Sequence, residues 1–293
     1  MEARITKAYN LVFNEKTGGY FQKISIGFAV IGFIFHLILI YLNINGWVHF
    51  SRGNELLQRP IQALYTPFSI VLFEEVYILL GFLTFSFSKS IITQFEILSL
   101  FILRGIFKDI SFIDLSKPGQ SAPEILNLFF SLGSLVVLIF LVALIRKTIR
   151  LQESGIKDGA LNRFVLIKKA LVLFYVIILS VLAFWDLFFW ARDQFLHDPN
   201  PIRSVSEINS VFYKDFFTLM IFFDVLILLI SLRYTQSYDL LLRNSGFILS
   251  TVILRISMTS PVPYGSLGFV LSAGLCLFFV FIYNRFQGEG NLL

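Results

Sequence analysis

The sequence predicts an all-α protein, a polytopic membrane helix bundle of about eight transmembrane helices with both termini in the cytoplasm. The first observation is composition. Of 293 residues, 56% are hydrophobic and only 15% are charged, whereas soluble domains carry about 25% charged residues. The second is that apolar residues gather in stretches long enough to cross a bilayer. The third is that lysine and arginine concentrate in alternate connections between those stretches.

Eight apolar stretches have close to the roughly 20 residues that a helix needs to cross the hydrocarbon core. Polar segments separate them, several with the proline and glycine residues that end helices. The seventh stretch admits an alternative, because a re-entrant segment there would leave seven crossings and put the C-terminus outside. The predicted spans cover residues 24–44, 63–86, 90–107, 124–145, 170–190, 215–232, 244–260 and 266–283.

These spans leave no room for a separate soluble domain, because eight helices and short connections use nearly the whole chain. Residues 1–23 form a short amphipathic, cationic leader, residues 24–284 a single transmembrane domain, and residues 285–293 a polar cytoplasmic tail. The most basic connection covers residues 146–169. We predict it to be a cytoplasmic loop into which the flanking helices continue, in a multi-pass protein of the cell membrane.

The distribution of positive charge predicts the orientation. With the N-terminus in the cytoplasm, the inside segments hold 15 of the 24 lysine and arginine residues, the outside loops hold seven, and two lie within spans. Connections with an excess of lysine and arginine stay on the cytoplasmic side. The bias repeats at successive connections, so both termini are expected there. In this assignment no span contains a lysine, so no retinal Schiff base is expected.

Ionisable side chains within the predicted spans are the main indication of function. A charged group at the centre of a spanning helix costs roughly 2.5 to 3.5 kcal/mol, so it faces a protein interior or a water-filled cavity. Acidic residues outnumber basic ones there, which favours a path for a cation or a proton. The carboxylates assigned to an ion pathway are Glu74, Glu75, Glu96 and Asp224, and the arginines assigned to ion pairing or gating are Arg104 and Arg255.

The order of the spans predicts which of these groups pair. Asp224 and Arg255 lie on successive spans and are expected to form an intramembrane ion pair, and Arg104 is expected to pair with Glu74 or Glu75. Adjacent residues on a helix point about 100° apart. One of the two glutamates is therefore expected to line a cavity while the other pairs. The alternative left open is that these pairs only neutralise one another and lock the bundle.

Polar side chains also surround the predicted inner end of the second and third spans. Glu96 and Arg104, eight residues apart, lie within about 80° of each other on a helix and are expected to face the same interior. Nearby hydroxyl and amide groups are expected to hydrate a vestibule at this mouth. The predicted vestibule consists of Thr84, Ser86, Ser88, Ser90, Thr93, Gln94 and Ser99.

Several chemistries lack the residues that they require. The sequence has no HExxH motif for zinc, no paired intramembrane histidines for haem and no glycine-rich loop for a nucleotide. It also has no TVGYG-like potassium filter. We therefore expect no metal, no cofactor and no catalytic residues. The net charge of +5 reports topology rather than nucleic-acid binding.

These observations favour a channel or transporter that moves a small cation or proton by means of intramembrane carboxylates. The expected partners are the lipid bilayer, the ion and a second copy of the chain, because small residues on the first and eighth spans favour a homo-oligomer. Two alternatives stay open. One is a scaffold or sensor that docks a cytoplasmic partner through residues 146–169. The other is a lipid-modifying enzyme that uses Asp186, Asp193 and Asp198.

Overall fold

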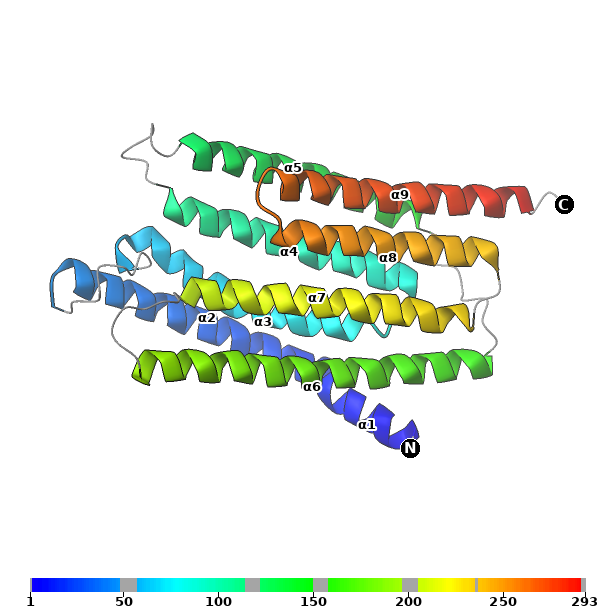
Figure 1. Cartoon of the computed structure of the whole chain (residues 1–293), viewed down its shortest axis with the longest axis horizontal. Coiled ribbons are helices and arrows are strands. Elements are labelled where there is room, and N and C mark those ends of the chain that lie inside the picture. The colour runs from blue at the N-terminus through cyan, green and yellow to red at the C-terminus, as the bar shows by residue number, and fades with distance from the viewer. Residues whose placement is uncertain are drawn as a thin grey trace.

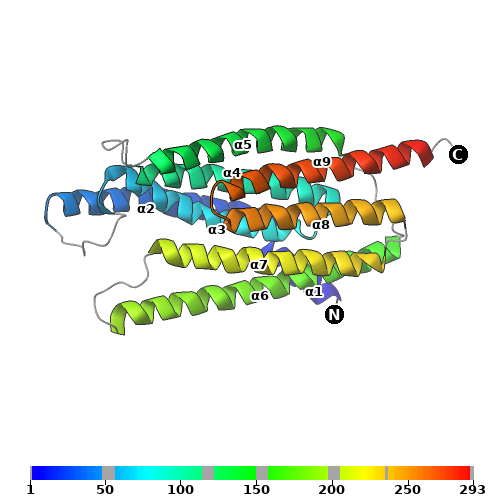
Figure 2. The ribbon, with the colours of Figure 1, turned by 45° about the horizontal axis from the view of Figure 1, so that its top comes forward.

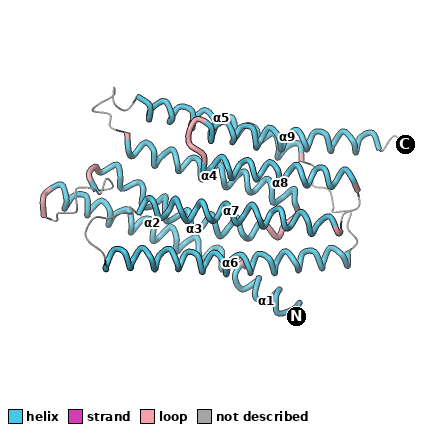
Figure 3. The backbone as a smooth tube through the Cα atoms, viewed as in Figure 1, coloured by secondary structure: helices cyan, strands magenta, loops and turns pink. Residues whose placement is uncertain are grey.

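The computed structural model describes residues 2–47, 57–113, 122–149, 158–196, 205–234 and 237–290, and Figure 3 draws the others in grey. Over the described residues all regular structure is helical. The long helices run alongside one another (Figures 1 and 2). In chain order the elements are α1 (Glu2–Val12), α2 (Glu15–Ile44), the 3-10 helix η2 (Pro60–Leu64), α3 (Tyr65–Phe82), α4 (Phe87–Phe112), α5 (Ala122–Thr148), α6 (Asp158–Leu196), α7 (Val205–Leu232), α8 (Tyr238–Thr259) and α9 (Tyr264–Gly290).

The described residues include eight helices that are long and apolar enough to cross a membrane. This confirms the predicted all-helical class with eight helices that could cross a membrane. The span predicted at 244–260 lies in α8, a continuous helix of 22 residues, which agrees with a full crossing. The basic connection is helical at both ends, as expected, because α5 reaches Thr148 and α6 begins at Asp158. Its middle part, residues 150–157, lies outside the described residues.

The two chain ends lie toward the same end of the bundle, at the right of Figure 1. The α3–α4 turn and the connection between α7 and α8 lie at that end too, as alternating antiparallel spans require. We name this end the terminal end. That it faces the cytoplasm stays a prediction from the charge distribution.

The helices pack in an order that brings distant parts of the chain together. From α2 to α5 each helix packs on the next, then α5 packs on α9, α9 on α8, α8 on α7, and α7 on α6. The helices α4 and α8 also touch across the bundle. As a result, the third and seventh spans, separated by more than 130 residues of sequence, share the interior in which the candidate site lies.

Apolar side chains cover the outside of the bundle, and polar side chains lie within it. Phe140 and Phe184 are 62% and 72% exposed, whereas Arg255 is fully buried. A soluble protein shows the opposite distribution, and exposed apolar surface of this extent indicates contact with lipid. This distribution, with apolar side chains outside and polar side chains inside, supports the placement of the helix bundle in a lipid bilayer.

Small residues allow α8 and α9 to approach closely. A Cβ atom at Gly246 would overlap the ring of Phe279, and one at Gly268 would overlap the side chain of Ser257. A Cβ at Gly274, in contrast, would meet nothing within 4 Å. The packing of α8 on α9 does not test a contact with a second copy, and the homo-oligomer stays a prediction.

Candidate functional site

A buried ion pair joins α7 to α8 in the interior of the bundle. Nη1 of Arg255 donates to Oδ2 of Asp224, as the order of the spans predicts. The other terminal nitrogen, Nη2, donates to Oε1 of Gln94 on α4. The hydroxyl of Thr251 shares its proton between the carbonyl oxygen of Ile248 at 2.9 Å and Oδ2 of Asp224 at 3.3 Å. The side chain of Arg255 is 0% exposed. One guanidinium therefore connects three helices, the consecutive helices α7 and α8 and the helix α4, which is distant from both in the sequence.

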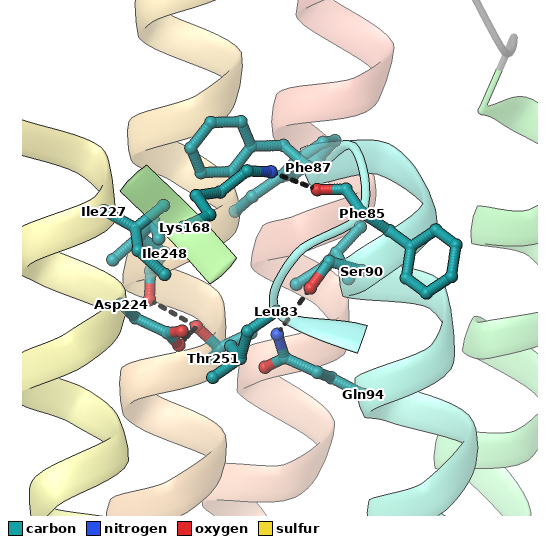
Figure 4. A pocket seen from close by; sticks show the side chains of 12 residues that line it. Leu83, Phe85, Phe87, Ser90, Gln94, Lys168, Asp224, Ile227, Ile248 and Thr251 are labelled. Atoms are coloured by element: carbon teal, nitrogen blue, oxygen red, sulfur yellow. Dashed lines mark hydrogen bonds between the residues drawn. The ribbon is translucent and has the colours of Figure 1, made fainter. Parts of the chain in front are cut away.

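A cavity of about 20 Å³ lies beside this pair, between α4, α6, α7 and α8. A volume of this size accommodates about one water molecule when polar groups surround it. Figure 4 shows Asp224 and Thr251 on one side and Gln94 on the other. The polar residues of the lining are Ser90, Gln94, Lys168, Asp224 and Thr251.

Lys168 was missed as a site residue by the sequence analysis, which placed it in the basic connection. It lies in α6 and within a candidate span, and only 3% of its surface is exposed. Its ammonium group donates to the carbonyl oxygen of Phe85 in the α3–α4 turn (Figure 4) and lies over the rings of Phe87 and Phe164. The signal in the sequence was the run of apolar residues that directly precedes it, 164–167.

Local structure at the start of α4 positions the lining residues. Ser86 is the N-cap of α4, and its side chain accepts a hydrogen bond from the backbone nitrogen of Lys89. This is the usual role of serine at a helix start. One turn further on, Nε2 of Gln94 donates to Oγ of Ser90 at 2.9 Å. That bond fixes the amide so that its oxygen faces Arg255.

A second intramembrane ion pair joins α3 to α4. Arg104 contacts Glu75, and the side chains of both are largely buried. The predicted pair is present, and Glu75 rather than Glu74 is its acidic member. Glu74 is also buried and interacts with the side chain of Gln22 on α2. The two adjacent glutamates thus face different helices, as the 100° rotation per residue requires.

Glu96 does not share an interior with Arg104, and that expectation was wrong. Glu96 Oε1 accepts a hydrogen bond of 3.1 Å from Arg146 on α5, and the two side chains are 39% and 72% exposed. The rotation of about 80° between positions 96 and 104 is enough to direct them toward different neighbouring helices. Glu96 therefore lies at the surface of the bundle.

The predicted vestibule residues divide into two groups. Ser90 and Gln94 line the cavity. Thr84 hydrogen-bonds to the hydroxyl of Tyr9 on α1, and Ser99 donates to a backbone carbonyl one turn earlier in α4. A vestibule role for the whole set stays a prediction. The remaining members are the N-cap Ser86, the buried Ser88 and the half-buried Thr93.

The side chains proposed for a lipid-modifying enzyme are outside what the structure describes. Asp198 lies in an undescribed segment, and the side chains of Asp186 and Asp193 are likewise not described. Among the described residues, no three histidine, cysteine, aspartate or glutamate side chains are grouped closely enough to hold a metal ion.

The groups around the cavity have a definite chemistry. Asp224 and Lys168 can each exchange a proton, whereas an arginine guanidinium stays protonated. Comparison of the chain with models of known protein families, with curated proteins and with solved structures finds no match. The function is therefore inferred from this geometry.

Proposed function

We propose that this membrane protein moves protons across the bilayer through the interior of its helix bundle, with Asp224 as the central exchanging group. The observation that supports this most is the cavity itself. It lies among candidate spans and is bordered by a carboxylate, an ammonium group, an amide and two hydroxyls. Polar and ionisable groups buried at such a place are costly and are typical of ion or proton pathways.

The charges around the cavity favour a proton over a metal cation. Lys168 and Arg255 contribute two positive charges against the single carboxylate of Asp224. This excess repels a sodium or potassium ion. The volume of about 20 Å³ suits one water molecule rather than a hydrated ion. Once Lys168 has moved aside, a water molecule there can carry a proton to Asp224, because ordered water bridges polar groups nearly as well as a direct hydrogen bond.

Lys168 closes the cavity toward the terminal end. Its ammonium group is bound to the carbonyl of Phe85 in the turn between α3 and α4. Entry of a proton from that side requires this contact to open. At the other side of the cavity, Asp224 is paired with Arg255. Protonation of Asp224 weakens that ion pair and thus couples proton entry to a local rearrangement.

The remaining carboxylates take different places in this proposal. Glu74 and Glu75 are buried on α3, where they interact with α2 and α4, and their place in an ion pathway stays a prediction. Glu96 lies at the bundle surface in an exposed ion pair and takes no part. This difference provides a matched control, since both Asp224 and Glu96 are carboxylates paired with arginine.

The test is proton flux into liposomes that contain the purified protein, followed with an internal pH-sensitive dye under a potassium diffusion potential. Asp224→Asn is expected to abolish the flux. Thr251→Val keeps the side-chain volume and the ion pair but removes one hydrogen bond to Asp224, and is expected to lower the flux about fivefold, the equivalent of roughly 1 kcal/mol. Glu96→Gln is expected to leave it unchanged.

The proposal fails if wild-type liposomes acidify no faster than protein-free ones. It also fails if Thr251→Val, with its ion pair intact, conducts like the wild type while Glu96→Gln does not. Size-exclusion profiles and helical circular dichroism of each variant show whether a loss of flux follows from unfolding. Replacing the proton gradient with a sodium or potassium gradient distinguishes a proton path from a cation path.

A further inference from the structure

A second polar site lies at the terminal end, between the leader helix α1 and the start of α6. The two helices enclose a cleft of about 860 Å³. It is separate from the central cavity and shares no lining residue with it. The lining residues are Glu2, Ala3, Thr6, Lys7 and Asn10 from α1, and Asn162, Arg163, Val165, Leu166 and Lys169 from α6.

The helix α1 is held firmly in place opposite α6. The hydroxyl of Tyr9 donates to the carbonyl of Gly81 at 3.1 Å, and the hydroxyl of Tyr77 donates to the carbonyl of Val12 at 2.7 Å. Phe13 stacks on both tyrosine rings, at centroid distances of 5.0 and 5.1 Å. The cleft therefore has two fixed walls, and its side chains do not have to be brought together when a ligand binds.

The cleft is positively charged. Lys7, Arg163 and Lys169 line it, against the single carboxylate of Glu2. Within the described ranges, none of these three cations forms an ion pair with a carboxylate. Lys169 lies over the ring of Tyr9 at 5.3 Å, which orients it along the α1 side of the cleft. The site thus offers three cations that are available to an anion.

The position of the cleft relative to the apolar stretches places it at the membrane surface. Tyr9 of α1 bonds to Gly81 and Thr84 at the end of α3, which places the cleft beside the α3–α4 turn at the terminal end. Val165 and Leu166 add apolar atoms to the same wall. On α1, Leu11 is 76% exposed, as expected for a helix that lies against lipid. The charge distribution predicts that this end is cytoplasmic, where anionic lipids gather and basic pockets between helices bind their headgroups.

We propose that the cleft between α1 and α6 binds the phosphate-bearing headgroup of an anionic lipid. Arg163 and Lys7 provide charge-assisted hydrogen bonds to phosphate oxygens, while Thr6, Asn10 and Asn162 provide neutral donors beside them. Val165 and Leu166 face the first carbons of the lipid chains. The inference does not depend on proton transport, because the two sites have no residue in common.

The test is a titration of the purified full-length protein with short-chain phosphatidylglycerol, with bound lipid counted by native mass spectrometry. The double variant Lys7→Gln/Arg163→Gln removes two exposed cations without touching the Tyr9 contacts. At about fivefold per cation near the membrane surface, its affinity is expected to fall about twentyfold. The control Lys89→Gln/Lys147→Gln removes two exposed cations at the same end, outside the cleft, and is expected to change the affinity less than twofold.

Three results would each overturn the proposal. The first is that short-chain phosphatidylcholine binds as tightly as phosphatidylglycerol. The second is that the two double variants weaken binding equally. The third is that inorganic phosphate at equal concentration displaces the lipid, which would assign the cleft to a free anion instead.

Discussion

Replacing Arg255 with leucine should destabilise the protein strongly, because this guanidinium connects α4, α7 and α8. Its side chain is fully buried, so solvent cannot take over its bonds. Asp224 would retain only the 3.3 Å bond from Thr251, and Gln94 would lose the partner of its carbonyl oxygen. Breaking a buried ion pair by removing one partner costs about 3–5 kcal/mol, and an unpaired buried acceptor adds about 1–3 kcal/mol. We expect a loss of at least about 4 kcal/mol.

The double variant Asp224→Leu/Arg255→Leu removes both charges and should recover most of that loss, since apolar replacement of a whole buried pair is often close to neutral. The free energy of unfolding is measured in mixed micelles at increasing sodium dodecyl sulfate. Arg146→Leu breaks the exposed pair with Glu96 and should cost less than about 1 kcal/mol. The reasoning is refuted if Arg255→Leu is no more destabilising than Arg146→Leu, or if the double variant loses as much as the two single variants added together.

Three further changes have directions that follow from the packing. Gly246→Ala should lower the free energy of unfolding by about 1–3 kcal/mol because its methyl group overlaps a phenylalanine of α9, whereas Gly274→Ala, which meets nothing within 4 Å, should be neutral in the same micelle titration. Tyr9→Phe should lower the free energy of unfolding by about 1 kcal/mol and speed amide hydrogen exchange in α1. The control is Tyr20→Phe at an exposed tyrosine; if both variants show the same exchange rate in α1, the prediction is contradicted. Lys168→Met should remove the bond to the α3–α4 turn, at a cost of about 1.5–3 kcal/mol, and raise passive proton leak in liposomes; an unchanged leak would show that Lys168 does not close the cavity.

The spans and the pairing of neighbours were predictable from the sequence. Length and hydropathy suffice to locate helices of this kind, and Asp224 with Arg255 follows from their places on successive spans. The contact of Arg255 with Gln94 was not predictable. It depends on α4 touching α8 across the bundle, and nothing in a hydropathy pattern states which non-consecutive helices meet.

Lys168 and Glu96 show a second limit of the pattern. Lys168 stands at the junction of a basic run and an apolar run, and charge alone assigned it to the connection. The structure extends α6 back to Asp158, which carries that lysine into the bundle. Glu96 was assigned to the interior because positions 96 and 104 lie within about 80° of each other around the helix axis. The helix α4 packs against both α3 and α5. Only that packing decides that Arg104 faces α3 while Glu96 faces α5.

The three-helix bond of Arg255 has a consequence for how the chain is made. Among the described helices, α8 is the least apolar of the candidate spans, and Arg255, four residues before its end, adds to the cost of its insertion. Synthesis runs from the N-terminus, so α4 with Gln94 and α7 with Asp224 leave the ribosome before α8 does. The partners of Arg255 are therefore already present when α8 is synthesised. The helices α7 and α8 can enter the bilayer together as a hairpin in which the charges of Asp224 and Arg255 neutralise each other.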